Sequence, residues 1–139
     1  MKAKNNNEFE LIVTITNRGY SDFVVVAARN AGASGGTIIN GRGTGVHEKD
    51  SILGVSIQPE KELVLTLVKK EEKSKVMKAI VDGSNLNKEG KGICFSLPVQ
   101  DVAGINHLLS EKEKKDVEKP KKTSTKKPSK KVEKEEKKD

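Results

Sequence analysis

The sequence predicts a single α+β domain with the element order βαββαβ, followed by a polar tail. Strands are indicated by apolar residues at alternate positions, and helices by apolar residues three and four apart. Glycine and proline lie between these stretches, where turns are expected. The chain has 139 residues, of which 33% are hydrophobic and 34% charged. This length and composition suit one globular domain with an extension rather than two separate cores.

The first strand and the first helix are expected between residues 9 and 32. Residues 9–15 alternate between apolar and more polar side chains, which is typical of a strand with one strongly apolar face. A helix is expected to follow, with Ser21 as its N-cap and Gly32 at its C-terminal end. The face of this helix that is predicted to be buried holds Phe23, Ala27 and Ala31.

The second and third strands are expected on either side of a long loop. Residues 35–41 form a short β-branched strand, and residues 42–54 have no sustained period and therefore predict a loop. The third strand is expected to begin near Val55 and to be strongest over residues 62–68. Pro59 lies inside this run, so that part is predicted to be an edge or a bulge, because proline cannot donate to a ladder.

A second helix and a fourth strand complete the order. Residues 70–81 have apolar positions at helical spacing with charged residues on the other face. Residues 92–99 predict a strand that Pro98 should end by removing an amide donor. The whole is the split arrangement of the ferredoxin-like fold, an antiparallel four-stranded sheet with both helices on one face.

The second face of this sheet also needs a cover. In the third and fourth strands consecutive residues are apolar, as in Val64 beside Leu65 and Cys94 beside Phe95, so both faces of these strands are apolar. Two helices cover only one side, and a monomer would expose a large apolar patch on the other. We therefore expect self-association through the second face.

The ends of the chain differ from the domain in composition. Residues 1–7 are expected to be a flexible N-terminus, residues 8–109 the folded domain, and residues 110–139 a disordered tail rich in lysine and glutamate. The tail holds thirteen Lys against eight Asp plus Glu, a net +5 out of the +7 of the whole chain. Two interpretations of the tail stay open, a solubilising extension and a weak nucleic-acid or membrane-surface contact.

Several classes of function are not expected. No stretch reaches the roughly 18–20 apolar residues that span a bilayer, and the start lacks the apolar run of a signal peptide, so a cytoplasmic protein is expected. The histidines and the single cysteine do not have the spacing of a metal site, and no catalytic elbow or Walker loop occurs, so an enzyme is not expected. Cys94 is predicted to be a small buried hydrophobe. Phe9, Phe23 and Phe95 are expected in the core, which leaves no aromatic platform for stacking RNA bases.

Two short motifs point to a known family. They are "RGTG" at residues 42–45 and "GKGICFSLPV" at residues 90–99. In their order and spacing they resemble the T-loop base and the glycine-rich B-loop of the PII signal-transduction proteins, which are trimeric ferredoxin-like regulators of enzymes and transporters in nitrogen metabolism. The resemblance covers about residues 8–106.

The resemblance implies a homotrimer with an adenine-nucleotide site between protomers. ATP, ADP or AMP would be the effector, with backbone amides and cations around its phosphates; glycine lets amides approach an anion closely. The implied ligand-binding residues are Arg42, Gly43 and Gly45 on one wall and Gly90, Lys91 and Gly92 on the other.

The chain departs from the family at several cationic positions. Lys91 and Ile93 stand where the family has an aspartate and a lysine, Gly104 and Asn106 where it has arginines, and Glu60 where it has a lysine. Each lost charge-assisted bond costs roughly 1.5–3 kcal/mol, so ADP, AMP or a smaller anion fits better than ATP. An alternative stays open in which Gly90 and Gly92 only permit strained backbone and Lys91 is solvated.

The resemblance also implies a loop that contacts a target enzyme or membrane transporter. Tyr20, the only tyrosine, lies outside this loop, so modification of a loop tyrosine is not expected. Two other hypotheses remain, a nucleic-acid-associated protein that acts through its basic tail and a trimer that binds no small molecule and acts by protein contact alone. The expected partner-contact loop is Val46, His47, Glu48, Lys49, Asp50 and Ser51, with His47 near the family's ligand-binding glutamine.

Overall fold

The computed structural model describes residues 8–46, 51–56 and 58–105. The expected flexible N-terminus and the expected tail lie outside these ranges, as do residues 106–109 of the predicted domain. None of the helices in the described part of the chain is long and apolar enough to cross a bilayer.

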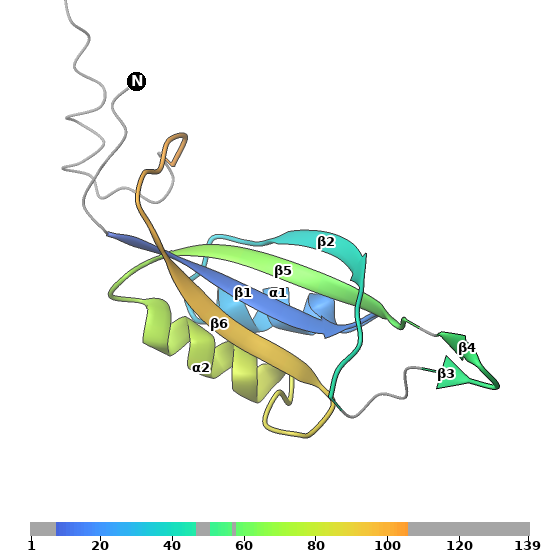
Figure 1. Ribbon diagram of the computed structural model, residues 1–139. Helices are drawn as coiled ribbons and strands as arrows, with labels where there is room; N and C mark the ends of the chain where they lie inside the picture. Colours follow the sequence, from blue (N-terminus) through green and yellow to red (C-terminus); the bar gives the residue numbers. More distant parts are fainter. Residues whose placement is uncertain (1–7, 47–50, 57, 106–139) are drawn as a thin grey trace, which may run out of the picture. The chain divides into compact units, whose positions relative to one another are not determined.

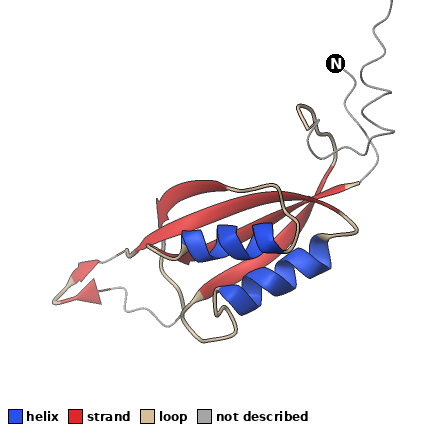
Figure 2. Cartoon of the chain, turned by 180° about the vertical axis from the view of Figure 1, so that it is seen from behind, coloured by secondary structure: helices blue, strands red, loops and turns tan. Residues whose placement is uncertain are grey.

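The domain is an antiparallel four-stranded sheet with two helices on one face (Figures 1 and 2). The strand order is β2-β5-β1-β6, so β2 and β6 are the two edges. This architecture confirms the predicted ferredoxin-like βαββαβ arrangement. The main elements are β1 (Phe9–Asn17), α1 (Ser21–Asn30), β2 (Thr37–Arg42), β5 (Glu60–Lys69), α2 (Lys73–Gly83) and β6 (Gly92–Val99).

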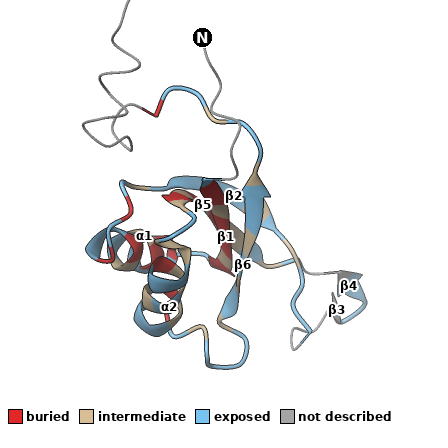
Figure 3. Ribbon diagram, turned by 90° about the vertical axis from the view of Figure 1, so that its left-hand side faces the viewer, coloured by how far each residue is buried: buried red, intermediate tan, exposed pale blue. Residues whose placement is uncertain are grey.

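The core lies between the helices and one face of the sheet, where the buried residues gather (Figure 3). Ile12 of β1 and Val64 of β5 are fully buried there, because alternate residues of a strand point to the same face. Cys94 of β6, which was predicted to be buried, is half-buried against this cluster, and burial raises the pKa of its thiol. The remaining core residues are Val24, Ala28, Ala31, Ala33, Val68, Val76 and Ile80.

The phase and the cap of α1 differ from the prediction. Val24 and Ala28 face the core, whereas Phe23 is 57% exposed; of the predicted buried face only Ala31 is buried. The helix begins at Ser21, whose side chain therefore cannot serve as the predicted N-cap, and no side-chain cap bond is made at Tyr20. Small alanines on several faces leave the phase of a helix poorly specified by its own sequence, so packing against the sheet decides it.

The connection from β2 to β5 is more structured than predicted. Within the expected loop lie β3 (Ser51–Ile52) and β4 (Val55–Ser56), which pair as a small hairpin. The third strand of the main sheet therefore does not begin near Val55 but at Glu60, directly after Pro59. Because β5 is an interior strand, proline can precede it but cannot form part of its ladder.

Pro98 does not end the last strand. The β6 ladder continues to Val99, with Pro98 opposite Glu10 of β1. An edge strand tolerates proline, because the missing N–H can fall on the side without a neighbour.

The sheet face opposite the helices is apolar, as predicted. Phe95 is 38% exposed on this face rather than in the core, and Ile93 and Leu97 beside it are also exposed. No described helix covers this side (Figure 2). Its apolar members are Phe9, Leu11, Val13, Ile15, Ile39, Leu63, Leu65, Leu67, Ile93, Phe95, Leu97 and Val99, of which Phe9 and Val13 are buried.

Candidate functional site

The predicted site residues lie at one end of the sheet but at its two opposite edges. Arg42 ends β2 at one edge and Gly92 begins β6 at the other, with β5 and β1 between them. Within one chain the two predicted walls therefore do not form a common pocket. Each wall has its own geometry.

The Gly90–Gly92 turn is fastened to the end of β1. The side-chain amide Nδ2 of Asn17 donates to the carbonyl of Gly90 at 3.0 Å. The hydroxyl of Thr16 donates to the carbonyl of Lys91 at 3.2 Å. The N–H of Lys91 donates to the carbonyl of Lys88 at 3.3 Å, which closes the turn.

The two glycines of this turn are needed for different reasons. Gly92 has φ +137°, and a Cβ there would lie 2.1 Å from the carbonyl oxygen of Ile15, so β1 excludes any side chain. Gly90 has φ +75° but open space around it. The structural requirement for Gly92 is therefore local packing, while Gly90 leaves the outer side of the turn uncovered.

The ammonium of Lys91 rests on an aromatic ring. Its Nζ lies 5.2 Å from the centroid of the Tyr20 ring, within the range of a cation–π contact. The Tyr20 ring in turn lies 6.0 Å from that of Phe23. Lys91 is half-buried.

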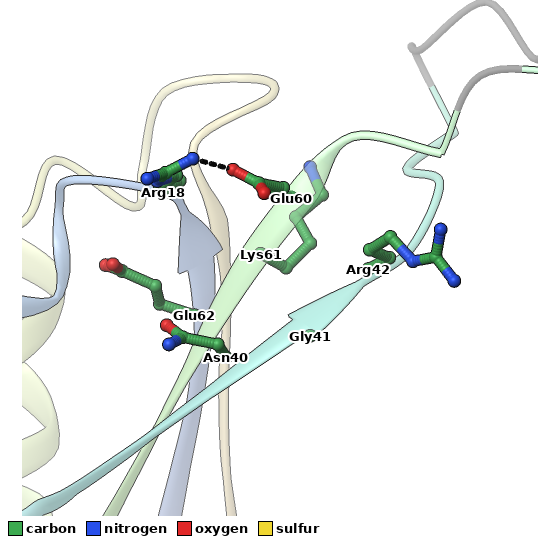
Figure 4. A pocket seen from close by; sticks show the side chains of 7 residues that line it. All are labelled: Arg18, Asn40, Gly41, Arg42, Glu60, Lys61 and Glu62. Carbon is green, nitrogen blue, oxygen red and sulfur yellow. Dashed lines mark hydrogen bonds and ion pairs between the residues drawn. The ribbon is translucent and has the colours of Figure 1, made fainter.

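Of the other predicted wall, Arg42 lines an open pocket of about 510 Å³ beside β2 and β5, whereas Gly43 and Gly45 are not among its lining residues (Figure 4). Arg18 and Glu60 point toward each other across it as an ion pair, whereas Arg42 points away from both. Next to Arg42, the N–H of Gly43 donates to the carbonyl of Pro59 at 3.1 Å. The residues that line the pocket are Arg18, Asn40, Gly41, Arg42, Glu60, Lys61 and Glu62.

Glu62 holds the start of α1 against this pocket. Its Oε2 accepts the N–H of Gly19 at 3.1 Å and that of Ser21 at 3.0 Å. A side-chain hydrogen bond from Ser21 is the largest cause that lowers the pKa of Glu62, with smaller contributions from these amides and from Arg18. A carboxylate from β5 thus accepts the N–H of Ser21, the first residue of α1, and that of Gly19 just before the helix, close to the positive end of the helix dipole.

Other expected site residues fall partly outside the description. Val46 is 99% exposed, and Ser51 belongs to β3. Residues 47–50 of the expected contact loop, and therefore His47, lie outside the described residues. Over the ranges that are described, no group of three or more His, Cys, Asp or Glu side chains could hold a metal ion.

Sequence reasoning missed Thr16, Asn17 and Arg18 as parts of the site. They are distant from Glu60 and Gly90 along the chain, and only the β1–β5 and β1–β6 registers bring them together. The polar run that ends the first strand was the only available signal, and polar residues at strand ends are common.

The fold and these two turns define a ferredoxin-like α+β protein with glycine-bearing turns at both edges of one end of its sheet. The chain belongs to the nitrogen regulatory protein P-II family, whose family model matches residues 9–107. Proteins of this family are trimers that bind small effectors and regulate target proteins.

Comparison with solved structures agrees with this assignment. The chain is similar to the crystal structure of Arabidopsis thaliana PII bound to citrate, with 25% identity and a TM-score of 0.57. The similarity covers 76% of this chain and 92% of that one. A search of curated proteins found no match.

Proposed function

We propose that this protein is a cytoplasmic trimeric regulator that binds a small anion, most favourably an adenine nucleotide, in clefts between subunits. In response it alters contacts with a target enzyme or membrane transporter, and nitrogen metabolism is the setting that the family suggests. It is a regulator rather than an enzyme. The observation that carries the proposal is the placement of Arg42 and Gly90–Gly92 at opposite edges of one sheet end, where neighbouring copies could join them.

The uncovered sheet face supports assembly. Large side chains such as Ile93, Phe95 and Leu97 are exposed on it although they belong to an ordered strand. Burying what remains exposed of each side chain stabilises an assembly by part of the roughly 1.5–3 kcal/mol that full burial contributes, and the sum over several side chains favours association through this face. The proposal requires that packing three sheets by these faces bring the β2 edge of one chain near the β6 edge of the next.

The charges in the site favour a small effector. Glu60 carries a negative charge into the pocket and occupies Arg18, while Arg42 makes no ion pair with another described residue. Arg42 and Lys91 are then the cations available to an anion that bridges the two turns. Two cations suit ADP or AMP better than ATP, and the citrate complex of the Arabidopsis thaliana protein makes a carboxylate anion a second probe.

Thermal unfolding and light scattering of the full chain test the proposal together. We expect a mass of three chains, and a rise in melting temperature with ADP or AMP that exceeds the rise with ATP, because a ligand bound only to the folded state stabilises it. Lys91→Ala should reduce that rise.

Three outcomes would contradict parts of the proposal. A mass of one chain would remove the shared cleft. A trimer without a shift for ADP, AMP, ATP or citrate would favour the protein that acts by contact alone. An unchanged shift for Lys91→Ala would remove Lys91 from the site.

A further inference from the structure

Two residues at the end of β1, Thr16 and Asn17, and Tyr20, the residue just before α1, contact the Gly90–Gly92 turn. Thr16 and Asn17 each donate a side-chain hydrogen bond to a carbonyl of the turn, and Tyr20 lies under the ammonium of Lys91. The N–H of Tyr20 itself donates to the carbonyl of Asn17 at 3.2 Å, which ties the three residues together.

The hydrogen bond from Thr16 orients an amide of the turn. The carbonyl of Lys91 and the N–H of Gly92 belong to the same trans peptide group and therefore point in opposite directions. Because the carbonyl points toward Thr16, the N–H of Gly92 points away from β1. Since β6 is an edge strand, that direction leads to the open side of the sheet. The N–H of Lys91 donates to the carbonyl of Lys88, so the N–H of Gly92 is the amide of this pair that points toward the open side.

The orientation of Asn17 is set by a lysine on its other side. The ammonium of Lys61 lies 2.7 Å from Oδ1 of Asn17. An ammonium can only donate, so this oxygen is the acceptor and Nδ2 is the group left for the carbonyl of Gly90. Asn17 therefore joins the pocket wall at Lys61 to the Gly90 turn.

The contact with the Tyr20 ring restricts the positions that the Lys91 ammonium can take. A lysine side chain free in water samples many rotamers, and ordering it on binding costs affinity. The ring holds one side of the ammonium and leaves its remaining N–H groups available to an anion. The cation is thus prepared before the anion arrives.

We propose that Thr16, Asn17 and Tyr20 are positioning residues that present the Gly92 amide and the Lys91 ammonium to the phosphate of the effector. This inference rests on the proposed function and adds three residues to its site. They act through the turn rather than by touching the ligand.

Calorimetric titration of the full chain with ADP tests the inference. Thr16→Val and Asn17→Ala should each weaken ADP binding roughly fivefold, the equivalent of one typical hydrogen bond. Tyr20→Leu should weaken it by a similar factor, whereas Tyr20→Phe, which keeps the ring, should bind like the wild type. Thr14→Val is the matched control, because Thr14 lies on the same strand but its hydroxyl bonds to Cys94 at 3.5 Å, away from the turn.

A double-mutant cycle separates positioning from general destabilisation. If Tyr20 acts through Lys91, Tyr20→Leu should have no further effect on ADP binding in a Lys91→Ala background. In nuclear magnetic resonance spectra the ring should shift the Lys91 side-chain protons in the wild type and in Tyr20→Phe, and not in Tyr20→Leu.

The results distinguish two kinds of failure. If the wild type binds ADP and the Thr16, Asn17 and Tyr20 variants bind it equally well, the positioning role is wrong and the proposed function stands. The role is also wrong if Tyr20→Leu weakens binding as much without Lys91 as with it. If the wild type binds neither ADP, AMP nor citrate, the effector site itself is absent and both proposals fall.

Discussion

At the scale of single residues, the site is shaped by backbone contacts that a sequence pattern does not reveal. Gly92 looks like half of a glycine pair, yet its lack of a side chain is required by the carbonyl of Ile15. Glu62 looks like an ordinary strand glutamate, yet it holds the amides at the start of α1. Both roles depend on a neighbouring strand.

The two glycines of the B-loop turn should respond differently to alanine. Gly92→Ala should lose roughly 1–3 kcal/mol from its positive φ and more from the displacement of β6 by the new Cβ. Gly90→Ala should lose only about 1–2 kcal/mol, because space is open there. Urea unfolding of both variants measures the difference, and equal losses would show that β1 does not approach Gly92 this closely.

Glu62 should make part of the stability depend on acid pH. Its pKa is lower in the folded chain than the ordinary value of 4.5, so the unfolded state binds its proton more readily. The stabilisation is therefore fully present above about pH 4.5 and is lost as the pH falls through the lower, folded pKa.

Glu62→Gln removes this charge and tests the assignment. At neutral pH we expect a loss of about 1 kcal/mol, typical of a weakened helix cap. The gap in melting temperature between the wild type and the variant should narrow as the pH falls below 4.5 and through the lower, folded pKa of Glu62. A gap that stays constant from pH 7 to pH 3 would mean that the Glu62 charge does not hold α1.

At the scale of elements, close contacts and edges decide what the helices and strands can do. The last residue of α2, Gly83, lies against Ala27 of α1, so the helices meet there without room for another methyl group. The edge strand β6 accepts Pro98, whereas the interior strand β5 begins only after Pro59. Proline is therefore kept out of the interior strand and tolerated in the edge strand.

The contact between the helices can be tested by exchanging glycine and alanine at Gly83 and Ala27. A Cβ at Gly83 would lie 2.7 Å from the Cβ of Ala27. Gly83→Ala should therefore destabilise the fold by about 1–3 kcal/mol through overpacking. Alanine also has the higher helix propensity, but at a helix end this gain is smaller than its usual value of about 1 kcal/mol and does not offset the loss. Ala27→Gly alone costs about 1 kcal/mol in helix propensity, so the comparison is made in that background, where Gly83→Ala should destabilise much less than in the wild type. An equal loss in both backgrounds would show that the two residues are not in contact.

At the scale of the whole molecule, the feature that needs an explanation is the apolar sheet face opposite the helices. A single chain leaves it in water, and the proposed trimer covers it. The same assembly would bring the Arg42 wall of one chain to the Gly90–Gly92 turn of another. Assembly and effector binding are therefore expected to fail together.

A charge on the open face should break the assembly. Phe95→Glu places a carboxylate among exposed apolar side chains, and we expect the scattering mass to fall from three chains to one, with loss of ADP binding. Ile38→Glu is the control, since Ile38 is similarly exposed but lies on the helix side of the β2 edge. A trimer that survives Phe95→Glu, or an Ile38→Glu variant that also dissociates, would place the interface elsewhere.

The sequence by itself determined the element order, the antiparallel sheet with helices on one face, the apolar second face and the two glycine-bearing turns. These follow from local periodicity and from residues with special backbone freedom, which act over a few positions. Only the tertiary structure decided that Phe23 is exposed, that Glu62 caps α1, and that Thr16, Asn17 and Tyr20 hold the Gly90–Gly92 turn. Those contacts depend on strand register and helix phase, which are set by packing between segments that are distant along the chain.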